Sequence, residues 1–209
     1  MPIVAVLNPK GGSGKTTLST NLAACLLRQE RSVLLVDTDP QGSARDWHAA
    51  KEDNPIELVA LDRAGSLKSL RGLAASFEWV VVDGAAKLAD MLAGTIKAAD
   101  CVLIPVQPSP YDVWAAEDVV DLIRARQEVT EGMPRAAFIV TRQIQGTKLG
   151  REVIEALQGY ELPLFANGTV QRQAYPASAD GGLSVFEAAD PKAHAEIEAI
   201  TAELLQFCK

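Results

Sequence analysis

Residues 9–17, PKGGSGKTT, join the apolar run Ile3–Leu7 to a helical pattern that begins at Lys15. Glycine permits backbone conformations closed to other residues, so the amide N–H groups of such a loop can face a polyphosphate. The N-terminus of the following helix adds partial positive charge. Lys15 can reach the outer phosphates, and the Thr16 hydroxyl can ligate Mg²⁺. The order strand, loop, helix therefore predicts a triphosphate site with magnesium at the end of the first strand.

The rest of the chain repeats this alternation of short apolar runs and longer helical patterns. Several runs are continuously apolar, which is typical of strands buried on both faces of a parallel sheet. The alternation predicts an α/β fold, a single-domain, doubly wound, mostly parallel sheet with helices on both faces. The expected strands are Ile3–Leu7, Val33–Asp37, Ile56–Leu61, Trp79–Asp83, Cys101–Val106, Phe138–Thr141 and Leu162–Phe165. The expected helices are Lys15–Gln29, Gly42–Lys51, Leu67–Ser76, Leu88–Ala98, Tyr111–Glu131, Lys148–Gln158 and Pro191–Cys208.

Composition narrows the class of protein. The chain has 209 residues, enough for one core, and 48% of them are hydrophobic, which excludes a disordered chain. We expect one domain over residues 1–209 and no separate N-terminal DNA-binding domain, since the phosphate loop begins at residue 9. No stretch approaches the roughly 18 apolar residues of a membrane span, and the start of the chain lacks the basic region of a signal peptide. We therefore expect a cytoplasmic protein.

Charge and cysteine content exclude other classes. The net charge of −7 argues against a surface that is basic throughout, although it leaves room for a local basic patch. Cys25, Cys101 and Cys208 are far apart and odd in number. They predict neither a disulfide framework nor a zinc site, which agrees with a reducing compartment.

Three aspartates lie at the carboxyl ends of predicted strands, the edge where such sheets bind ligands. Asp37 and Asp39 follow the second run, and Asp83 ends the fourth. One of the first two can support the metal and its waters while the other orients an attacking water. The alternative for Asp39 is that it merely caps the next helix. Asp83 has the Walker B pattern, an apolar strand ending in an acid that holds Mg²⁺ through water.

These motifs together resemble the ParA/MinD family of P-loop ATPases, most closely its short ParF-like partition proteins. The loop is similar to the family's deviant Walker A motif, K-G-G-x-G-K-[ST]. The resemblance implies ATP or ADP with Mg²⁺ as ligands, and it implies that Lys10 reaches across a nucleotide-sandwich dimer to the partner's phosphates. Asp37-Thr38-Asp39-Pro40-Gln41 resembles switch I, which makes Asp39 the hydrolytic residue and places Asp37 near the metal. Gly84-Ala85-Ala86 lacks the proline pair that many relatives carry there, a departure that concerns switch II and not the metal site.

The later chain carries weaker signals of the same family. The proline-rich segment 104–110 resembles one that lines the dimer face, although it is equally well explained as a rigid connection. The family's adenine pocket would lie at Thr141-Arg142 and at 169–173. The expected catalytic residues are Lys10, Lys15 and Asp39, and the expected metal-binding residues are Thr16, Asp37 and Asp83. The expected nucleotide-binding residues are Lys10, Gly11, Gly12, Ser13, Gly14, Lys15, Thr16, Thr17, Thr141, Arg142, Thr169 and Val170.

Duplex DNA binding rests on contacts between basic side chains and phosphates. Residues 135–175 carry five basic side chains against three acidic ones, a bias that by itself indicates only a solvated face. The resemblance places a DNA surface in this part of the dimer, so the expected contacts are Arg142, Lys148, Arg151 and Arg172. The few aromatic residues form no stacking series, which disfavours single-strand binding.

The function that the resemblance implies is an ATPase for plasmid or chromosome segregation, cytoplasmic and associated with the nucleoid. Its ATP-bound homodimer would bind non-specific DNA, and a ParB-like centromere-binding partner would stimulate slow hydrolysis. The same cycle could position an organelle or other cargo. A MinD-like membrane regulator is the third alternative, but residues 192–209 carry a net charge of −1 where a membrane helix needs basic residues. An electron-transfer relative would need cysteines at matched positions near the dimer axis, and none of the three fits.

Overall fold

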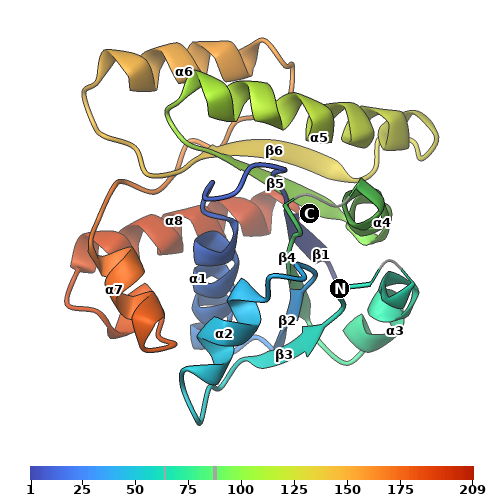
Figure 1. The fold of residues 1–209 in the computed structure, drawn as a ribbon, viewed down its shortest axis with the longest axis vertical. Coiled ribbons are helices and arrows are strands. Elements are labelled where there is room, and N and C mark those ends of the chain that lie inside the picture. The colour runs from blue at the N-terminus through green and yellow to red at the C-terminus, as the bar shows by residue number, and fades with distance from the viewer. Residues whose placement is uncertain (64, 87–88) are drawn as a thin grey trace.

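The computed structural model describes residues 1–63, 65–86 and 89–209. Its centre is a six-stranded sheet in the order β3-β2-β4-β1-β5-β6, in which all neighbours are parallel (Figure 1). The α/β fold with a parallel sheet is thus confirmed. The strands are β1 Ile3–Val6, β2 Val33–Asp37, β3 Glu57–Ala60, β4 Trp79–Asp83, β5 Cys101–Val106 and β6 Arg135–Val140.

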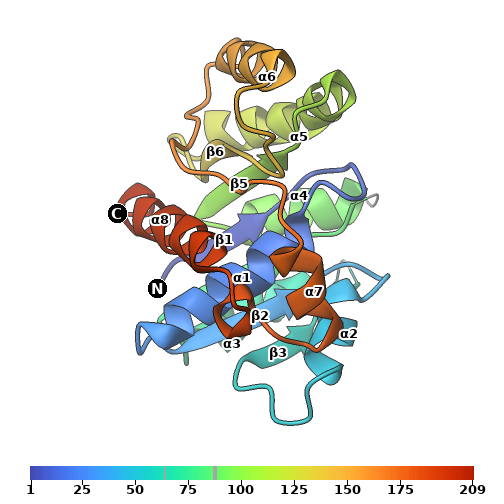
Figure 2. The same ribbon diagram turned by 90° about the vertical axis from the view of Figure 1, so that its left-hand side faces the viewer.

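Helices cover both faces of the sheet (Figures 1 and 2). The α1, α2, α7 and α8 helices pack on one face, and α3, α4, α5 and α6 pack on the other. The α-helices are α1 Lys15–Arg28, α2 Ser43–Ala49, α3 Leu70–Ala74, α4 Ala89–Ala98, α5 Pro110–Glu128, α6 Lys148–Gln158, α7 Ala174–Asp180 and α8 Pro191–Phe207. Two short 3-10 helices, η1 Ser66–Ser69 and η2 Val185–Glu187, complete the described elements.

The β1 strand shows why the central runs are continuously apolar. Its side chains alternate between the two faces of the sheet. Ile3 and Ala5 enter the core under α3–α6, whereas Val4 and Val6 enter the core under α1 and α8. All four residues are fully buried, so no position of this strand tolerates a polar side chain.

Two expected elements differ from the structure, and one observed helix was not predicted. Residues Leu162–Phe165 do not form a strand. One isolated bridge joins Leu164 to Phe138, and the preceding residue, Pro163, has no N–H to donate to a neighbouring strand. The helix expected over 67–76 is divided into η1 and α3. The α7 helix, seven residues long, is the element that the sequence pattern did not predict. Leu88, the expected first residue of α4, lies outside the described residues.

The cysteine prediction is wrong in one respect. Cys101 at the start of β5 pairs with Cys208 at the end of α8 in a disulfide, whereas Cys25 is buried and free. The two partners are 107 residues apart, so their spacing carries no signal of the pairing. Among the described helices, none is both long and apolar enough to cross a membrane.

Candidate nucleotide site

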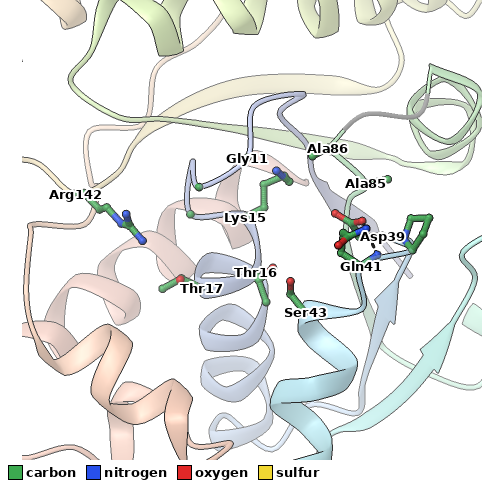
Figure 3. A pocket seen from close by; sticks show the side chains of 13 residues that line it. Gly11, Lys15, Thr16, Thr17, Asp39, Gln41, Ser43, Ala85, Ala86 and Arg142 are labelled. Atoms are coloured by element: carbon green, nitrogen blue, oxygen red, sulfur yellow. Dashed lines mark hydrogen bonds between the residues drawn. The ribbon is translucent and has the colours of Figure 1, made fainter.

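Two adjoining cavities open at the carboxyl edge of the sheet. The larger, of about 700 Å³, lies between the phosphate loop and the loop after β2 (Figure 3). The smaller, of about 290 Å³, lies between the phosphate loop and α7. Gly14, Thr17 and Arg142 line both. A nucleotide's phosphates and its base could therefore occupy neighbouring spaces along one groove.

The phosphate loop presents an open helix N-terminus to the larger cavity. Gly12 and Gly14 have φ of 81° and 94°, values that favour glycine. Gly14 is the N-cap of α1, and no side chain of the described residues accepts a hydrogen bond there. The first N–H groups of α1 therefore remain available to an anion, as a phosphate site requires.

The buried environment of Lys15 favours the binding of a negatively charged group. It lies on the first turn of α1 and is only 7% exposed, and its Nζ donates a hydrogen bond to the Lys10 carbonyl at 3.0 Å. Burial lowers the pKa of Lys15, and the nearby carboxylates of Asp83 and Asp39 partly oppose that shift. A bound phosphate group would favour the charged form of Lys15, because it would place negative charge beside the ammonium.

Thr16 and Asp83 provide the hard oxygen donors that Mg²⁺ prefers. The Thr16 hydroxyl donates to Asp83 Oδ2 at 2.7 Å, and the Ser19 hydroxyl donates to Oδ1 at 3.2 Å. Asp83 is 1% exposed, and its burial raises the pKa of the carboxyl to about 7. A buried carboxylate that is costly to ionise gains from a cation, so these residues fit a magnesium ion bound with the nucleotide.

Asp37 and Asp39 are placed differently. Asp37 is fully buried, and its two oxygens accept the N–H groups of Asp39 at 2.9 Å and Arg45 at 3.0 Å. Its pKa is raised by burial. Asp37 thus stabilises the conformation of the β2–α2 loop. It lies opposite Asp83 in the register of β2 and β4. Asp39 instead lines the larger cavity together with Lys15, where it can face a bound nucleotide (Figure 3).

Lys10 lies in the phosphate loop directly before Gly11, and its Nζ is paired to the Asp112 carboxylate at the start of α5. The expected base-binding residues gather around the smaller cavity, which Thr141, Arg142, Thr169 and Val170 all line. Thr141 also ties this cavity to the phosphate loop, because its hydroxyl donates to the Ser13 carbonyl at 2.9 Å.

Glu196 on α8, which sequence reasoning missed, binds residues that line this cavity. It accepts hydrogen bonds from the Val170 N–H at 3.2 Å and the Tyr175 hydroxyl at 2.8 Å. It also accepts from the Arg172 guanidinium at 2.8 and 2.6 Å. Burial and the bond to Glu196 raise the pKa of Tyr175. One carboxylate thus holds three residues of the wall, two in the segment before α7 and one in α7 itself.

The basic residues expected to bind DNA do not form one set. Arg142, Lys148 and Arg151 are exposed, and Lys148 pairs with Glu152 of its own helix. Arg172 is held by Glu196, with Asp190 3.9 Å away, and its side chain is 19% exposed. In this subunit the Arg172 guanidinium is paired within the cavity wall, and its contact with DNA phosphates stays a prediction.

The chain is similar to known proteins in sequence and in fold. A family model described as the CobQ/CobB/MinD/ParA nucleotide binding domain matches residues 4–183. The chain belongs to this family. It is 31% identical to the maintenance of carboxysome distribution protein A of Halothiobacillus neapolitanus over 88% of this chain and 86% of that protein. It is 29% identical to the chromosome partitioning protein ParA of Myxococcus xanthus, over 76% of this chain and 71% of that one.

Solved structures have the same fold. The apo form of McdA from Cyanothece superposes with a TM-score of 0.83 at 20% identity, over 98% of this chain and 99% of that one. Cobyrinic acid a,c-diamide synthase from Mycobacterium smegmatis, with bound ADP and magnesium, superposes with a TM-score of 0.76 at 22% identity, over 99% and 94%. The chain is therefore a nucleotide-binding P-loop protein of the ParA/MinD type, and homologous folds hold adenine nucleotides with magnesium.

Proposed function

We propose that the chain is a Mg²⁺-dependent ATPase that closes into a nucleotide-sandwich homodimer, binds non-specific duplex DNA in that state, and positions a cargo by repeated cycles of binding and release. The observation that carries this proposal is the convergence of Lys15, Thr16 and Asp39 on one cavity, with Asp83 behind them. The proposal includes a second subunit because Lys10 resembles the lysine that acts across the dimer.

The residues of the cavity divide the work of phosphoryl transfer. The α1 N-terminus and Lys15 bind and orient the phosphates, and Thr16 with Asp83 would hold Mg²⁺, which neutralises charge as the terminal phosphate leaves. Asp39 would orient the attacking water. Asp37 keeps Asp39 in position by accepting its backbone N–H. Lys10 of the partner subunit would add a positive charge, so that hydrolysis depends on the dimer.

DNA binding rests on Arg142, Lys148 and Arg151, which are exposed. Each is a modest contribution in a chain of net charge −7. A dimer would double the number of contacts, and affinity for DNA falls steeply as contacts are lost. DNA binding should therefore appear only when ATP brings two subunits together.

The cargo has two candidates. A DNA site bound by a ParB-like partner is the first, by analogy with chromosome partitioning proteins. A protein organelle is the second, because relatives at 31% and 34% identity are named for carboxysome distribution. Deletion of the gene separates them: loss of a plasmid or mispositioned chromosome origins would indicate the first, and clustered organelles the second.

The biochemical test uses Asp39→Ala with random duplex DNA. We expect this variant to bind ATP, to sediment as a dimer and to stay on DNA, while wild type is released as ATP is hydrolysed. Raised salt should dissociate both, because phosphate contacts supply the affinity. Rapid ATP turnover by Asp39→Ala would contradict its hydrolytic role, and an ATP-loaded wild-type protein that remains monomeric would contradict the whole cycle.

A further inference from the structure

We propose that Asp112 holds Lys10 in the nucleotide-free subunit, so that Lys10 must exchange this carboxylate for the partner's nucleotide when the dimer forms. The inference rests on the proposed sandwich dimer and adds a positioning residue to it. Asp112 is the third residue of α5 and lies 102 residues from Lys10 in the sequence.

The backbone of Lys10 is fixed on its own subunit. Its N–H donates to Asn8 Oδ1 at 2.8 Å, and Asn8 Nδ2 in turn donates to the Pro105 carbonyl at 2.8 Å. The Lys10 carbonyl accepts from Lys15 Nζ at 3.0 Å and from the Ser13 hydroxyl at 3.2 Å. With the main chain held on both sides, a change of partner must come from the Lys10 side chain, which is 36% exposed.

The buried carboxylate of Asp112 is stabilised by the charge of this lysine. Its side chain is 3% exposed, and Oδ2 pairs with Lys10 Nζ. Among the described residues, nothing donates a hydrogen bond to its buried Oδ1. A buried carboxylate without a cation is costly. The α5 N-terminus compensates only part of that cost, because helix-end charges are partial. Lys10 is therefore the main counter-charge of Asp112.

The two partners of Lys10 exclude each other. One ammonium cannot neutralise a carboxylate inside its own subunit and a phosphate in the opposite subunit at full strength, because interaction falls with distance. The bond to Asp112 consequently raises the threshold for dimerisation. A nucleotide with more negative charge at its outer end meets that threshold better, so the contact favours dimers formed on ATP over dimers formed on ADP.

The surroundings of Lys10 offer a way to observe the exchange. Tyr111 and Trp114 on the first turns of α5 are 70% and 62% exposed, and their rings pack edge to face at 5.4 Å. Lys10 Nζ lies 6.0 Å from the centre of the Tyr111 ring. Trp47 and Trp79, the other two tryptophans, are buried. A change in the exposure of Trp114 on dimerisation should therefore dominate any change in tryptophan fluorescence.

The first test measures the reactivity of Lys10 in the nucleotide-free protein. Asp112→Asn keeps the shape of the side chain and removes its charge, and Asp118→Asn, exposed on the same helix, is the matched control. Lys10 acetylation by a small reagent, followed by mass spectrometry, should be several-fold faster in Asp112→Asn than in wild type or the control. Equal rates in all three proteins would overturn the proposal.

The second test measures ATP-dependent dimerisation by sedimentation and Trp114 fluorescence, with Asp39→Ala present to prevent hydrolysis. Asp112→Asn should tighten the dimer about tenfold, the value of one charge-assisted hydrogen bond, and should also allow dimers on ADP. A weaker or unchanged dimer would overturn the proposal, since Asp112 would then support the dimer or have no part in it. If the Asp39→Ala parent itself stays monomeric with ATP, the proposed function fails, and faster acetylation in Asp112→Asn would still establish the resting contact.

A double-mutant cycle on Tm distinguishes loss of the Lys10–Asp112 contact from general misfolding of a variant. Lys10→Ala leaves Asp112 buried and unpaired, so its Tm should fall by about 3 °C or more. Adding Asp112→Asn to Lys10→Ala should recover most of that loss. Absence of recovery in the double variant would show that the two side chains do not depend on each other and would overturn the proposal.

Discussion

The cavity at the phosphate loop is lined largely by two short segments near the start of the chain, whereas the cavity beside it is assembled from segments far apart. Residues 11–17 and 39–43 provide ten of the thirteen residues that line the first cavity, and the phosphate loop adds its backbone N–H groups and Lys15. The second draws on Thr141, residues 169–172, α7 and α8. Phosphates are recognised by charge and by one loop's geometry, but a base needs walls, and here one carboxylate, Glu196, holds them. Variants should therefore separate phosphate binding from base binding.

The largest expected effect is on the phosphate side. Lys15→Ala removes the buried ammonium and should weaken ATP affinity more than about a hundredfold, the cost of losing charge-assisted contacts to a phosphate. Isothermal titration with ATP and with tripolyphosphate measures it, with the exposed Lys97→Ala as control. Both ligands should be affected alike. ATP binding that survives in Lys15→Ala would contradict the division between the two cavities.

The sequence indicates the phosphate side well because its chemistry is local. Glycines at 11, 12 and 14, Lys15 and Thr16 form one uninterrupted motif, and the strand carrying Asp83 is continuously apolar. Glu196 and Asp112 gave no comparable signal, since Glu196 acts on residues 21 to 26 positions away and Asp112 acts on a residue 102 positions away. An acidic residue on an amphipathic helix looks like any solvated one until the fold brings a partner to it. The Cys101–Cys208 pair escaped notice for the same reason.

A second prediction uses the buried acid of the phosphate side. The pKa of Asp83 is raised to about 7 in the folded protein, above 3.8 when unfolded, so between these values the folded state holds a proton that the unfolded state has lost. Stability should therefore fall as pH rises from about 4 to 7, and the full cost, on the order of 4 kcal/mol, should be present at pH 8. Asp37, whose pKa burial also raises, acts in the same direction.

Asp83→Asn cannot lose that proton. Without metal or nucleotide, and with a chelator present, it should equal wild type at pH 4 and exceed it at pH 8 by most of this amount in chemical denaturation. With Mg²⁺ and ATP the order should reverse, because the variant lacks the carboxylate that would support the ion. If wild type and Asp83→Asn show the same pH profile, Asp83 is not the group that titrates.

The third prediction concerns the base side alone. Glu196→Gln keeps the size of the side chain but removes the charge that holds Arg172 and Tyr175, so ATP affinity should fall about tenfold, as for the loss of one charge-assisted hydrogen bond. Tripolyphosphate affinity should not change, because the phosphate loop is untouched. Glu198→Gln, exposed on the same helix, is the control. An equal loss for both ligands would show that the two cavities act as one.

The smallest effect distinguishes the two kinds of arginine in the C-terminal part of the chain. Arg151 is exposed on α6, whereas Arg172 is committed to Glu196. The logarithm of DNA affinity falls with the logarithm of salt concentration by about 0.9 for each phosphate contact. Arg151→Ala should therefore reduce that slope by about one per subunit and leave ATP affinity intact, because its side chain lines neither cavity.

Arg172→Ala should do the opposite. It should weaken ATP binding, and it should leave the salt slope of DNA affinity unchanged when the protein is saturated with nucleotide. DNA titrations of the ATP-loaded Asp39→Ala dimer at several salt concentrations measure both. A slope that changes in Arg172→Ala but not in Arg151→Ala would mean that the carboxylate of Glu196 releases its arginine to DNA, and the wall of the base cavity would then be part of the DNA surface.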